Sequence, residues 1–352
     1  MTQRVEGWGF NNDGQLGDGT TTDRRTPVIL AGLTQNDVIA VDAGGAHGLA
    51  LLSNGTVKAW GTNVNGQLGD GTPISHPTPG TVARLTDVRA IAAGGDHSLA
   101  LLSDGTVKAW GRNVNGQLGD GTTNDAAIPV TVTGLTGVKA IAAGADHSLA
   151  LLSDGTVKSW GANGSGQLGD GTTTSSTTPV TVTGLADVRE LASGASFSLA
   201  LLSDRTVRAW GFNANGQLGD GTTTTRTTAV SVTGLSGIRR VAAGDAHALA
   251  VLNDRTVKAW GFNNSGELGD GTTTEQHTPV TAAGLAGVRT VAAGANHSLA
   301  ITANGTVKSW GNNGFGQLGV GGINNQLTAV TVLNGLASAT GIAGGTFISF
   351  AI

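Results

Sequence analysis

The sequence predicts an all-β protein: a seven-bladed β-propeller with four-stranded antiparallel blades and a closing blade shared between the N- and C-terminal ends of the chain. One phrase around tryptophan recurs about every 50 residues, a period typical of propellers and solenoids. Each copy has room for four short strands and none for a helix, and the two chain ends are complementary half-units. We therefore expect residues 1–352 to form a single domain. The tryptophans of the seven copies are Trp8, Trp60, Trp110, Trp160, Trp210, Trp260 and Trp310.

The unit at residues 84–133 illustrates the elements of one blade. A short β-type run of small residues comes first, and an almost continuous apolar run follows it. The Asp104-Gly105 pair is a tight-turn signal, and the segment after it alternates between apolar and polar residues. A loop then leads to the last strand. The four expected strands are Val88–Ala93, Ser98–Leu102, Thr106–Trp110 and Ile128–Val132.

The composition of the four runs predicts their order in the blade. The first run is rich in alanine, as at Ala92-Ala93 and Ala142-Ala143, and small residues suit the strand nearest a crowded axis. Pro129, Pro179 and Pro279 fall in the fourth run. Because proline lacks a donor N–H and belongs at the edge of a sheet, we expect the fourth strand to be outermost.

The chain ends predict a closed ring. Residues 4–9 match a third strand, and residues 341–352 match a first and a second strand. Neither half is a blade, but together they make one. An open solenoid would instead carry a polar cap at each end.

Composition and charge exclude several classes of function. The net charge is −4 and charged residues make up 12% of the chain, so there is no electrostatic footprint for nucleic acid. The absence of cysteine excludes disulfides and cysteine-based metal or redox sites. No apolar run is long enough for a membrane span, and none resembles a signal peptide. We expect a soluble, cytoplasmic monomer that binds neither nucleic acid nor membrane.

Three phrases resemble those of the regulator of chromosome condensation repeat family. They are Ala-Ala-Gly-x-x-His-Ser-Leu-Ala-Leu at 142–151, Asp-Gly-x-Val-x-x-Trp-Gly-x-Asn at 104–113 and Gly-Gln-Leu-Gly at 116–119. The resemblance covers essentially the whole chain. It implies a seven-bladed propeller with a split closing blade, in agreement with the reading of the residues.

Members of this family have different activities, because a shared fold does not determine function. The resemblance therefore implies several possible activities for this chain. The family's founder is a guanine-nucleotide exchange factor that docks on chromatin, a plant member senses ultraviolet-B light through clustered tryptophans, and a bacterial member inhibits β-lactamases with aromatic residues in the turn between strands one and two. Here the loops are short, basic tails are missing and each repeat has one tryptophan. The turn positions carry no aromatic residue in six units: Ala46, Asp96, Asp146, Ser196, Ala246 and Asn296.

Repeated polar residues favour structural roles over metal binding. The histidines His47, His97, His147, His247 and His297 share one repeat position, and residues related by a ring diverge instead of meeting at one ion. We expect them to be buried and hydrogen-bonded to a neighbouring turn, with Phe197 and Phe347 replacing them in two units. The aspartates of Gly-Asp-Gly-Thr fit Asx-type turns better than a calcium loop. The tryptophans fit a core between blades. We expect no metal and no cofactor.

The differences between repeats predict a binding face. In a four-stranded meander the loops between strands one and two and between strands three and four emerge on the same side, and functional residues in repeat proteins often vary over a constant frame. Exposed phenylalanines on such loops suit protein interfaces, although they could also pack on their own blade. The predicted partner-binding residues are Phe10, Arg112, Phe212, Phe262, Phe315, Asp96, Asp146 and Asp245.

Three functional hypotheses follow. The first is a non-enzymatic scaffold that presents this loop face to a protein or peptide. The second is a nucleotide exchange factor for a small GTPase, or an enzyme that uses the depression on the axis, although no catalytic residues stand out. The third is an engineered or recently amplified repeat without an evolved ligand, because the units at 84–133 and 134–183 are nearly the same.

Overall fold

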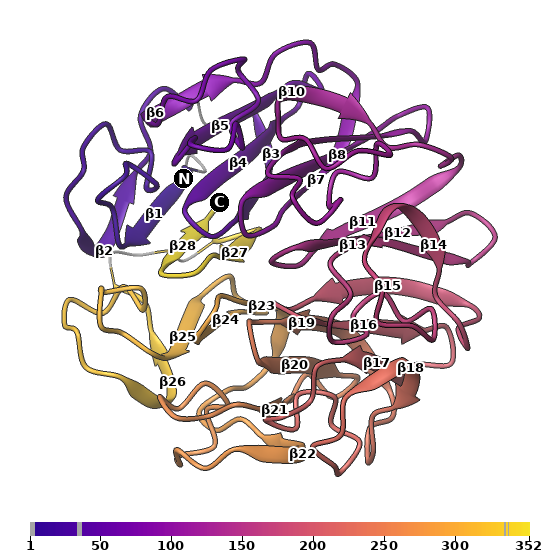
Figure 1. The fold of residues 1–352 in the computed structure, drawn as a ribbon. Helices are drawn as coiled ribbons and strands as arrows, with labels where there is room; N and C mark the ends of the chain where they lie inside the picture. Colours follow the sequence, from indigo (N-terminus) through magenta and orange to yellow (C-terminus); the bar gives the residue numbers. More distant parts are fainter. Residues whose placement is uncertain (1–3, 34–36, 334–335, 337) are drawn as a thin grey trace.

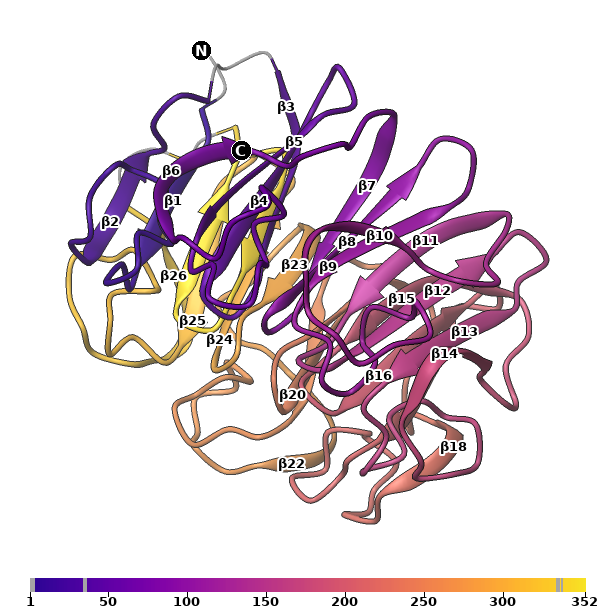
Figure 2. The same cartoon turned by 45° about the horizontal axis from the view of Figure 1, so that its top comes forward.

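The protein is a closed ring of β-sheets. The computed structural model describes residues 4–33, 37–333, 336 and 338–352, so the first residues, on which the expectation about a signal peptide rests, lie outside the described part. Seven four-stranded antiparallel sheets stand as blades around a central axis (Figure 1), and Figure 2 shows them side by side from a tilted direction. No helix in the described part has the length and hydropathy to cross a membrane.

The first strand of each blade faces the axis, as predicted, because consecutive first strands contact one another around the ring. The first strands are β3 (Val38–Ala43), β7 (Val88–Ala93), β11 (Val138–Ala143), β15 (Val188–Ser193), β19 (Ile238–Ala243), β23 (Val288–Ala293) and β27 (Ile342–Gly344). The second strands are β4 (His47–Leu52), β8 (His97–Leu102), β12 (His147–Leu152), β16 (Phe197–Leu202), β20 (His247–Leu252), β24 (His297–Thr302) and β28 (Ile348–Ala351).

The fourth strand forms the outer edge of each blade, where the prolines lie. The third strands are β5 (Val57–Gly61), β9 (Val107–Gly111), β13 (Val157–Gly161), β17 (Val207–Gly211), β21 (Val257–Gly261), β25 (Val307–Gly311) and β1 (Glu6–Gly9). The fourth strands are β6 (His76–Thr81), β10 (Ala126–Thr131), β14 (Ser176–Thr181), β18 (Arg226–Ser231), β22 (Gln276–Thr281), β26 (Gln326–Thr331) and β2 (Arg24–Ile29).

Strand boundaries differ from the prediction mainly in the fourth strand, which begins at Ala126 and not at Ile128. The ladder continues because Gly111, with a φ of 101°, still pairs with Ala126, across an irregularity that precedes Val130. Glycine is suited to this left-handed conformation. The same residue pairs with His97, which extends the second strand by one residue.

The closing blade has the predicted composition. Its strand order is β2-β1-β28-β27, and β1 pairs with β28 from Glu6 opposite Ala351 to Gly9 opposite Ile348. Figure 1 shows β28, in yellow, beside β1, in indigo. The N-terminal third strand thus completes a sheet begun by the last residues of the chain.

The tryptophans join neighbouring blades, as predicted. All seven are fully buried, and each indole N–H donates to a backbone carbonyl of the preceding blade. Trp110, for example, donates to the carbonyl of Gln67 over 2.8 Å. The large apolar ring fills the space between sheets while its polar group is satisfied.

The five histidines also link neighbouring blades. Each is hydrogen-bonded to a serine in the second strand of the next blade, and not to a turn as predicted. His47 Nε2 lies 2.9 Å from Ser98 Oγ of the next blade, and Ser98 donates its own proton to the Gln67 carbonyl. The serine therefore accepts from the histidine, which places the imidazole proton on Nε2. Nδ1 of each of these five histidines has no partner among the described residues.

The prediction that Phe347 replaces a histidine is wrong. Trp8 pairs with Ser349 as Trp310 pairs with Ser298, so Ile348 occupies the histidine position of the closing blade and Phe347 lies one residue earlier, in the turn. The apolar replacements, Phe197 and Ile348, occur where the next blade offers Ala248 or Gly48 instead of a serine. The histidine is present where a hydroxyl can accept from it.

Arginine occupies left-handed backbone at three turns where sister blades carry glycine: at Arg205 and Arg255 between strands two and three, and at Arg84, which follows a fourth strand. Arg205 has a φ of 68° and Arg255 a φ of 66°, whereas the equivalent glycines, such as Gly105 at 83°, adopt the conformation without strain. A side chain in this region costs about 1–2 kcal/mol, and glycine loses roughly 0.5–1 kcal/mol through its greater freedom in the unfolded chain.

We expect Arg205→Gly and Arg255→Gly each to raise the free energy of unfolding by roughly 0.5 kcal/mol, because the relief of strain exceeds the entropic loss. Chemical denaturation of each variant beside the wild type measures the change. A loss of stability in both variants would show that the arginine side chains stabilise the turns.

Candidate partner-binding face

The two sets of loops on the predicted face are joined by a repeated hydrogen bond. The first residue after each third strand donates its backbone N–H to the turn between strands one and two of the same blade, as Arg112 does to the Asp96 carbonyl over 2.9 Å. The equivalent bond joins Phe10 to Phe347 over 3.0 Å. The variable residues are therefore held at the same place on every blade, on the side called here the loop face.

A buried asparagine fixes the base of each loop. The side chain of Asn63 donates to the carbonyls of Thr72 and Ile74 and accepts from the N–H of Leu68 over 2.9 Å. The predicted Asx-type turns are also present, since Asp70 accepts from the N–H of Thr72 over 2.8 Å. Despite partial burial, hydrogen bonds from Thr72, Asn63 and His76 hold the pKa of Asp70 below its usual value. Side chains that vary therefore project from ordered loops.

Three phenylalanines meet where the last repeat joins the closing blade. The ring centroids of Phe10 and Phe315 are 4.9 Å apart at an interplanar angle of 65°, and those of Phe315 and Phe347 are 4.8 Å apart. Phe315 is 37% exposed, and Phe10 and Phe347 are half-buried. These residues are called the phenylalanine cluster. Two of them, Phe10 and Phe315, were predicted from the sequence.

Other predicted residues lie apart from this cluster. Phe212 is 37% exposed and Phe262 is half-buried, each on the loop of its own blade. Val64 and Val114 are 67% and 52% exposed on two further loops. The loop face therefore carries apolar side chains on most blades, with the phenylalanine cluster as the place where they contact each other.

Arg112 joins two of the predicted aspartates. Its guanidinium lies 3.0 Å from Asp146 of the next blade, and Gln117 donates to the same carboxylate over 3.0 Å. Asp96 accepts from Gln67 over 3.3 Å. Burial, with a contribution from Asp146, raises the pKa of Asp96, while Arg112 opposes the shift. This polar group lies on different blades from the phenylalanine cluster.

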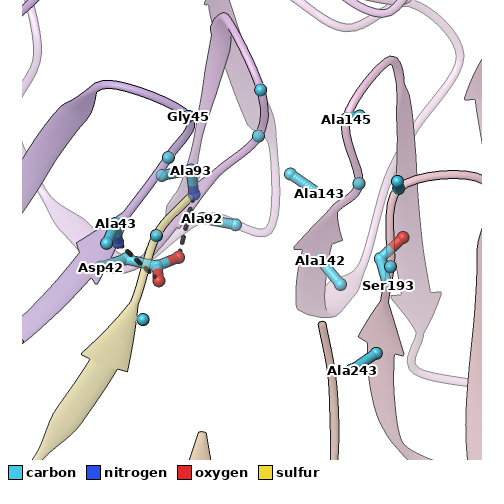
Figure 3. A pocket seen from close by; sticks show the side chains of 18 of the residues that line it. Asp42, Ala43, Gly45, Ala92, Ala93, Ala142, Ala143, Ala145, Ser193 and Ala243 are labelled. Carbon is cyan, nitrogen blue, oxygen red and sulfur yellow. Dashed lines mark hydrogen bonds between the residues drawn. The ribbon is translucent and has the colours of Figure 1, made fainter. Parts of the chain in front are cut away.

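Asp245 belongs to a different feature, the mouth of the axial channel. A cavity of about 350 Å³ opens on the axis, and its wall is formed mainly by alanine and glycine of the innermost strands and their turns. Figure 3 shows Asp42 in this wall, with its carboxylate accepting from the N–H groups of Ala43 and Ala93 over 2.9 Å. Burial raises the pKa of Asp42 to about 6, and burial also raises that of Asp245.

The channel brings a serine and a histidine together in an arrangement that favours packing over catalysis. Ser193 Oγ lies 2.8 Å from His147 Nε2, but burial lowers the pKa of His147 to about 4. A base of that strength is poorly matched to neutral pH, and Nδ1 has no orienting carboxylate among the described residues. Among the residues that the structure describes, no cluster of three or more histidine or acidic side chains could hold a metal ion.

Comparison with protein families agrees with the repeat. The model of the RCC1-like domain matches residues 1–238, which is well over half of the chain. The chain belongs to the RCC1 repeat family. Models of the regulator of chromosome condensation (RCC1) repeat also match residues 238–267 and 288–317 and residues 256–301.

Curated relatives match this RCC1-repeat propeller over short segments. "Protein RCC2 homolog" of Danio rerio is 45% identical over 64 residues, which is 18% of this chain and 13% of the relative. "Ultraviolet-B receptor UVR8" of Arabidopsis thaliana is 35% identical over 83 residues, or 24% of this chain and 19% of the relative. The matched segments thus span less than a fifth of either relative's length.

Solved structures resemble the whole propeller. Human WBSCR16 has a TM-score of 0.89 and 24% identity, with 99% of both chains covered. Prp20p of Saccharomyces cerevisiae has a TM-score of 0.88 and 26% identity, over 100% of this chain and 91% of that chain. Prp20p is described together with its binding properties to Gsp1p and histones.

Sequence reasoning missed Phe347 as a member of the loop face. The closing unit therefore does carry an aromatic residue in the turn between strands one and two, unlike the six units considered from the sequence. The spacing concealed it, because assigning Phe347 to the histidine position shifts the alignment of that unit by one residue. Pairing each second strand with its tryptophan, Ser349 with Trp8, corrects the alignment.

Proposed function

We propose that this propeller is a non-enzymatic scaffold whose loop face binds a protein or peptide partner. The observation that carries the proposal is the phenylalanine cluster, in which three aromatic rings from adjacent blades contact each other at the surface. Aromatic anchors of this kind dominate the affinity of many protein interfaces. The Arg112–Asp146 pair, on two other blades of the same face, would add polar contacts that set the orientation of the partner.

The rigidity of the loops supports the same proposal. The residue after each third strand, Phe10 among them, is bonded to the adjacent turn and precedes a buried asparagine. The N–H of Phe315 donates to the side chain of the buried Gln317, so these positions are set before a partner arrives. Preorganised groups lose little conformational freedom on binding. An aromatic surface on an ordered frame is therefore suited to capturing a specific partner.

The expected result of the triple substitution Phe10→Ala, Phe315→Ala and Phe347→Ala is at least a tenfold loss of affinity for a partner captured from the source cell. Truncating a hot-spot aromatic typically costs about 2 kcal/mol or more, and three contribute here. Biolayer interferometry with the purified partner measures the change.

The control replaces Ile39, which is 58% exposed at the start of an innermost strand on the opposite face. Ile39→Ala should leave the affinity within twofold. Equal affinity of the triple variant and the wild type, with both shown to be folded by circular dichroism, would remove the loop face as the binding surface.

A small GTPase is a second candidate for the partner. The likeness to Prp20p, which has described binding properties to Gsp1p, extends over the whole chain at 26% identity. The proposal predicts faster release of a fluorescent guanine nucleotide from a cognate GTPase when the propeller is added. A partner that binds tightly without any acceleration would favour the scaffold over the exchange factor.

A further inference from the structure

The face opposite the loop face carries an arginine patch that the linear sequence conceals. Each turn between strands two and three contacts the first strand of the next blade: the Arg205 carbonyl accepts from Ile238 over 3.1 Å, and the Arg255 carbonyl accepts from Val288 over 3.0 Å. Arg239 and Arg240 follow the first of these contacts, and Arg289 follows the second. These five residues, Arg205, Arg239, Arg240, Arg255 and Arg289, are called the arginine patch.

Most of the positive charge of the patch is unpaired. All five arginines are exposed, and within the described residues one of them forms an ion pair, Arg240 with Glu190 at 3.3 Å. The carboxylates of the nearby Asp204 and Asp254 accept hydrogen bonds from the N–H groups of Thr206 and Thr256 in their own turns. Arg205 donates to Asn253 of the next blade over 2.5 Å, which holds its guanidinium beside the turn that contains Arg255.

Two residues of the patch adopt a strained backbone conformation. Arg205 and Arg255 lie at φ 68° and 66°, in the region that side chains avoid. The sister turns place glycine there: Gly55, Gly105, Gly155 and Gly305. Strained residues often mark functional sites. Arg84, Asp87 and Asp187 also have a positive φ outside the patch, so the strain supports the site only together with the exposed guanidinium groups.

The occupant must match several guanidinium groups in a small area. Arginine forks bind phosphate and carboxylate oxygens through paired N–H donors, and clusters of them recognise phosphorylated motifs. A nucleic acid backbone is a poorer match, because it needs a continuous track of cations, whereas Glu190, Asp204 and Asp254 interrupt this surface and the net charge of the chain is −4. A single phosphate dianion therefore suits this patch better than an extended polyanion.

We propose that the arginine patch binds the phosphate group of a phosphorylated segment in a partner protein. The phosphate oxygens accept from the guanidinium groups of Arg205, Arg239 and Arg255, and the rest of the segment extends across the turns. This site is on the opposite side of the ring from the loop face and does not rest on the function proposed above.

The test uses a fluorescein-labelled peptide with one phosphoserine flanked by glycine and alanine, followed by fluorescence anisotropy at low ionic strength. The phosphopeptide should bind at least tenfold more tightly than its serine and glutamate versions, and inorganic phosphate should compete only weakly. A glutamate peptide that binds equally well would overturn the assignment to phosphate. Inorganic phosphate that binds as tightly as the peptide would overturn the assignment to a protein segment.

The matched variant is Arg205→Gly with Arg255→Gly, which copies the turns of four sister blades and should therefore fold. It should lose at least tenfold in affinity for the phosphopeptide. The control is Arg84→Gly with Lys108→Gln, which changes the net charge equally at another part of the ring and should keep the affinity within twofold. Unchanged binding by the first variant, or an equal loss in the control, would contradict the proposed site.

Discussion

Acidification is expected to unfold this propeller between about pH 6 and pH 4. This is above the pH of about 4 or lower at which the carboxylates of surface ion pairs become protonated. Burial lowers the pKa of His47, His147 and His247 to about 4, and burial together with neighbouring histidines lowers that of His97 and His297 to about 3. The unfolded value is 6.5. The unfolded chain therefore binds more protons throughout this window.

The sign and size of the effect follow from proton linkage. A depressed folded-state pKa means that the stabilisation is complete above pH 6.5 and is lost as the pH falls toward 4. Each pH unit costs about 1.4 kcal/mol per histidine, so the five histidines cost on the order of 10 kcal/mol at pH 5. That is comparable with the entire stability of a typical domain. Tryptophan fluorescence during a pH titration measures the transition.

Buried carboxyl groups oppose this trend but do not reverse it. Burial raises the pKa of Asp42 to about 6, so its destabilising effect at neutral pH is relieved as the pH falls below 6. By pH 5 the relief is about 1.4 kcal/mol. Burial also raises the pKa of five further carboxyl groups: Glu6, Asp96, Glu190, Asp245 and Glu267. The histidines dominate because all five have a pKa of about 4 or below, whereas Asp42 is the one member of this set of carboxyl groups that is shifted as strongly.

The chain supplies its own control for the histidine effect. His97→Phe with Ser148→Ala copies the natural Phe197 and Ala248 junction, so it should fold and should take up about one proton fewer on acid unfolding than the wild type. The pH dependence of the unfolding free energy between pH 6 and 5 gives this number. An unchanged slope, or a wild-type protein that keeps its tryptophan environment at pH 4, would contradict the account.

Phe350→Ala is expected to lower the free energy of unfolding by about 3–5 kcal/mol, the range for truncating a buried phenylalanine. Phe350 is fully buried, and its ring contacts Trp60 with centroids 5.4 Å apart. It lies on β28, the strand that joins the C-terminal end to β1. The substitution therefore weakens the closing blade. Urea denaturation followed by tryptophan fluorescence measures the loss.

A compensating pair tests whether this packing specifies closure. Phe350 lies opposite Gly7, and a Cβ atom on Gly7 would come within 2.8 Å of the Phe350 ring. The equivalent pair in the second repeat is Leu99 opposite Ala109. Gly7→Ala alone should cost about 1–3 kcal/mol through overpacking, and adding Phe350→Leu should recover part of that loss. Additive effects of the two changes would show that the residues do not constrain each other.

The repeat made the architecture predictable because seven copies report the same structure. Alanine in the first run and proline in the fourth fix the order of the strands, and the half-units at the two ends predict how the ring closes. The position of Phe347 could not be read the same way, since the closing unit has a different spacing and lacks the histidine that marks the others.

The sites were less predictable, because they form between blades. Phe10 and Phe315 are far apart along the chain, and they meet through a closure that joins the two ends. Arg205 and Arg239 are on neighbouring blades and come near each other because the Arg205 carbonyl accepts from Ile238, the first residue of the next blade's first strand. A signal for the latter does exist in the sequence: arginine replaces the turn glycine at positions 205 and 255, and an alignment of the repeats exposes it.

Hydrogen–deuterium exchange of the propeller, with and without its captured partner, tests the central functional claim most directly. The account predicts slower exchange in the loop that follows Phe10, in the loop that contains Phe315 and in the turn at Phe347. Protection confined to the turns around Asp104 and Asp254, on the other side of the ring, would contradict the loop face as the binding surface.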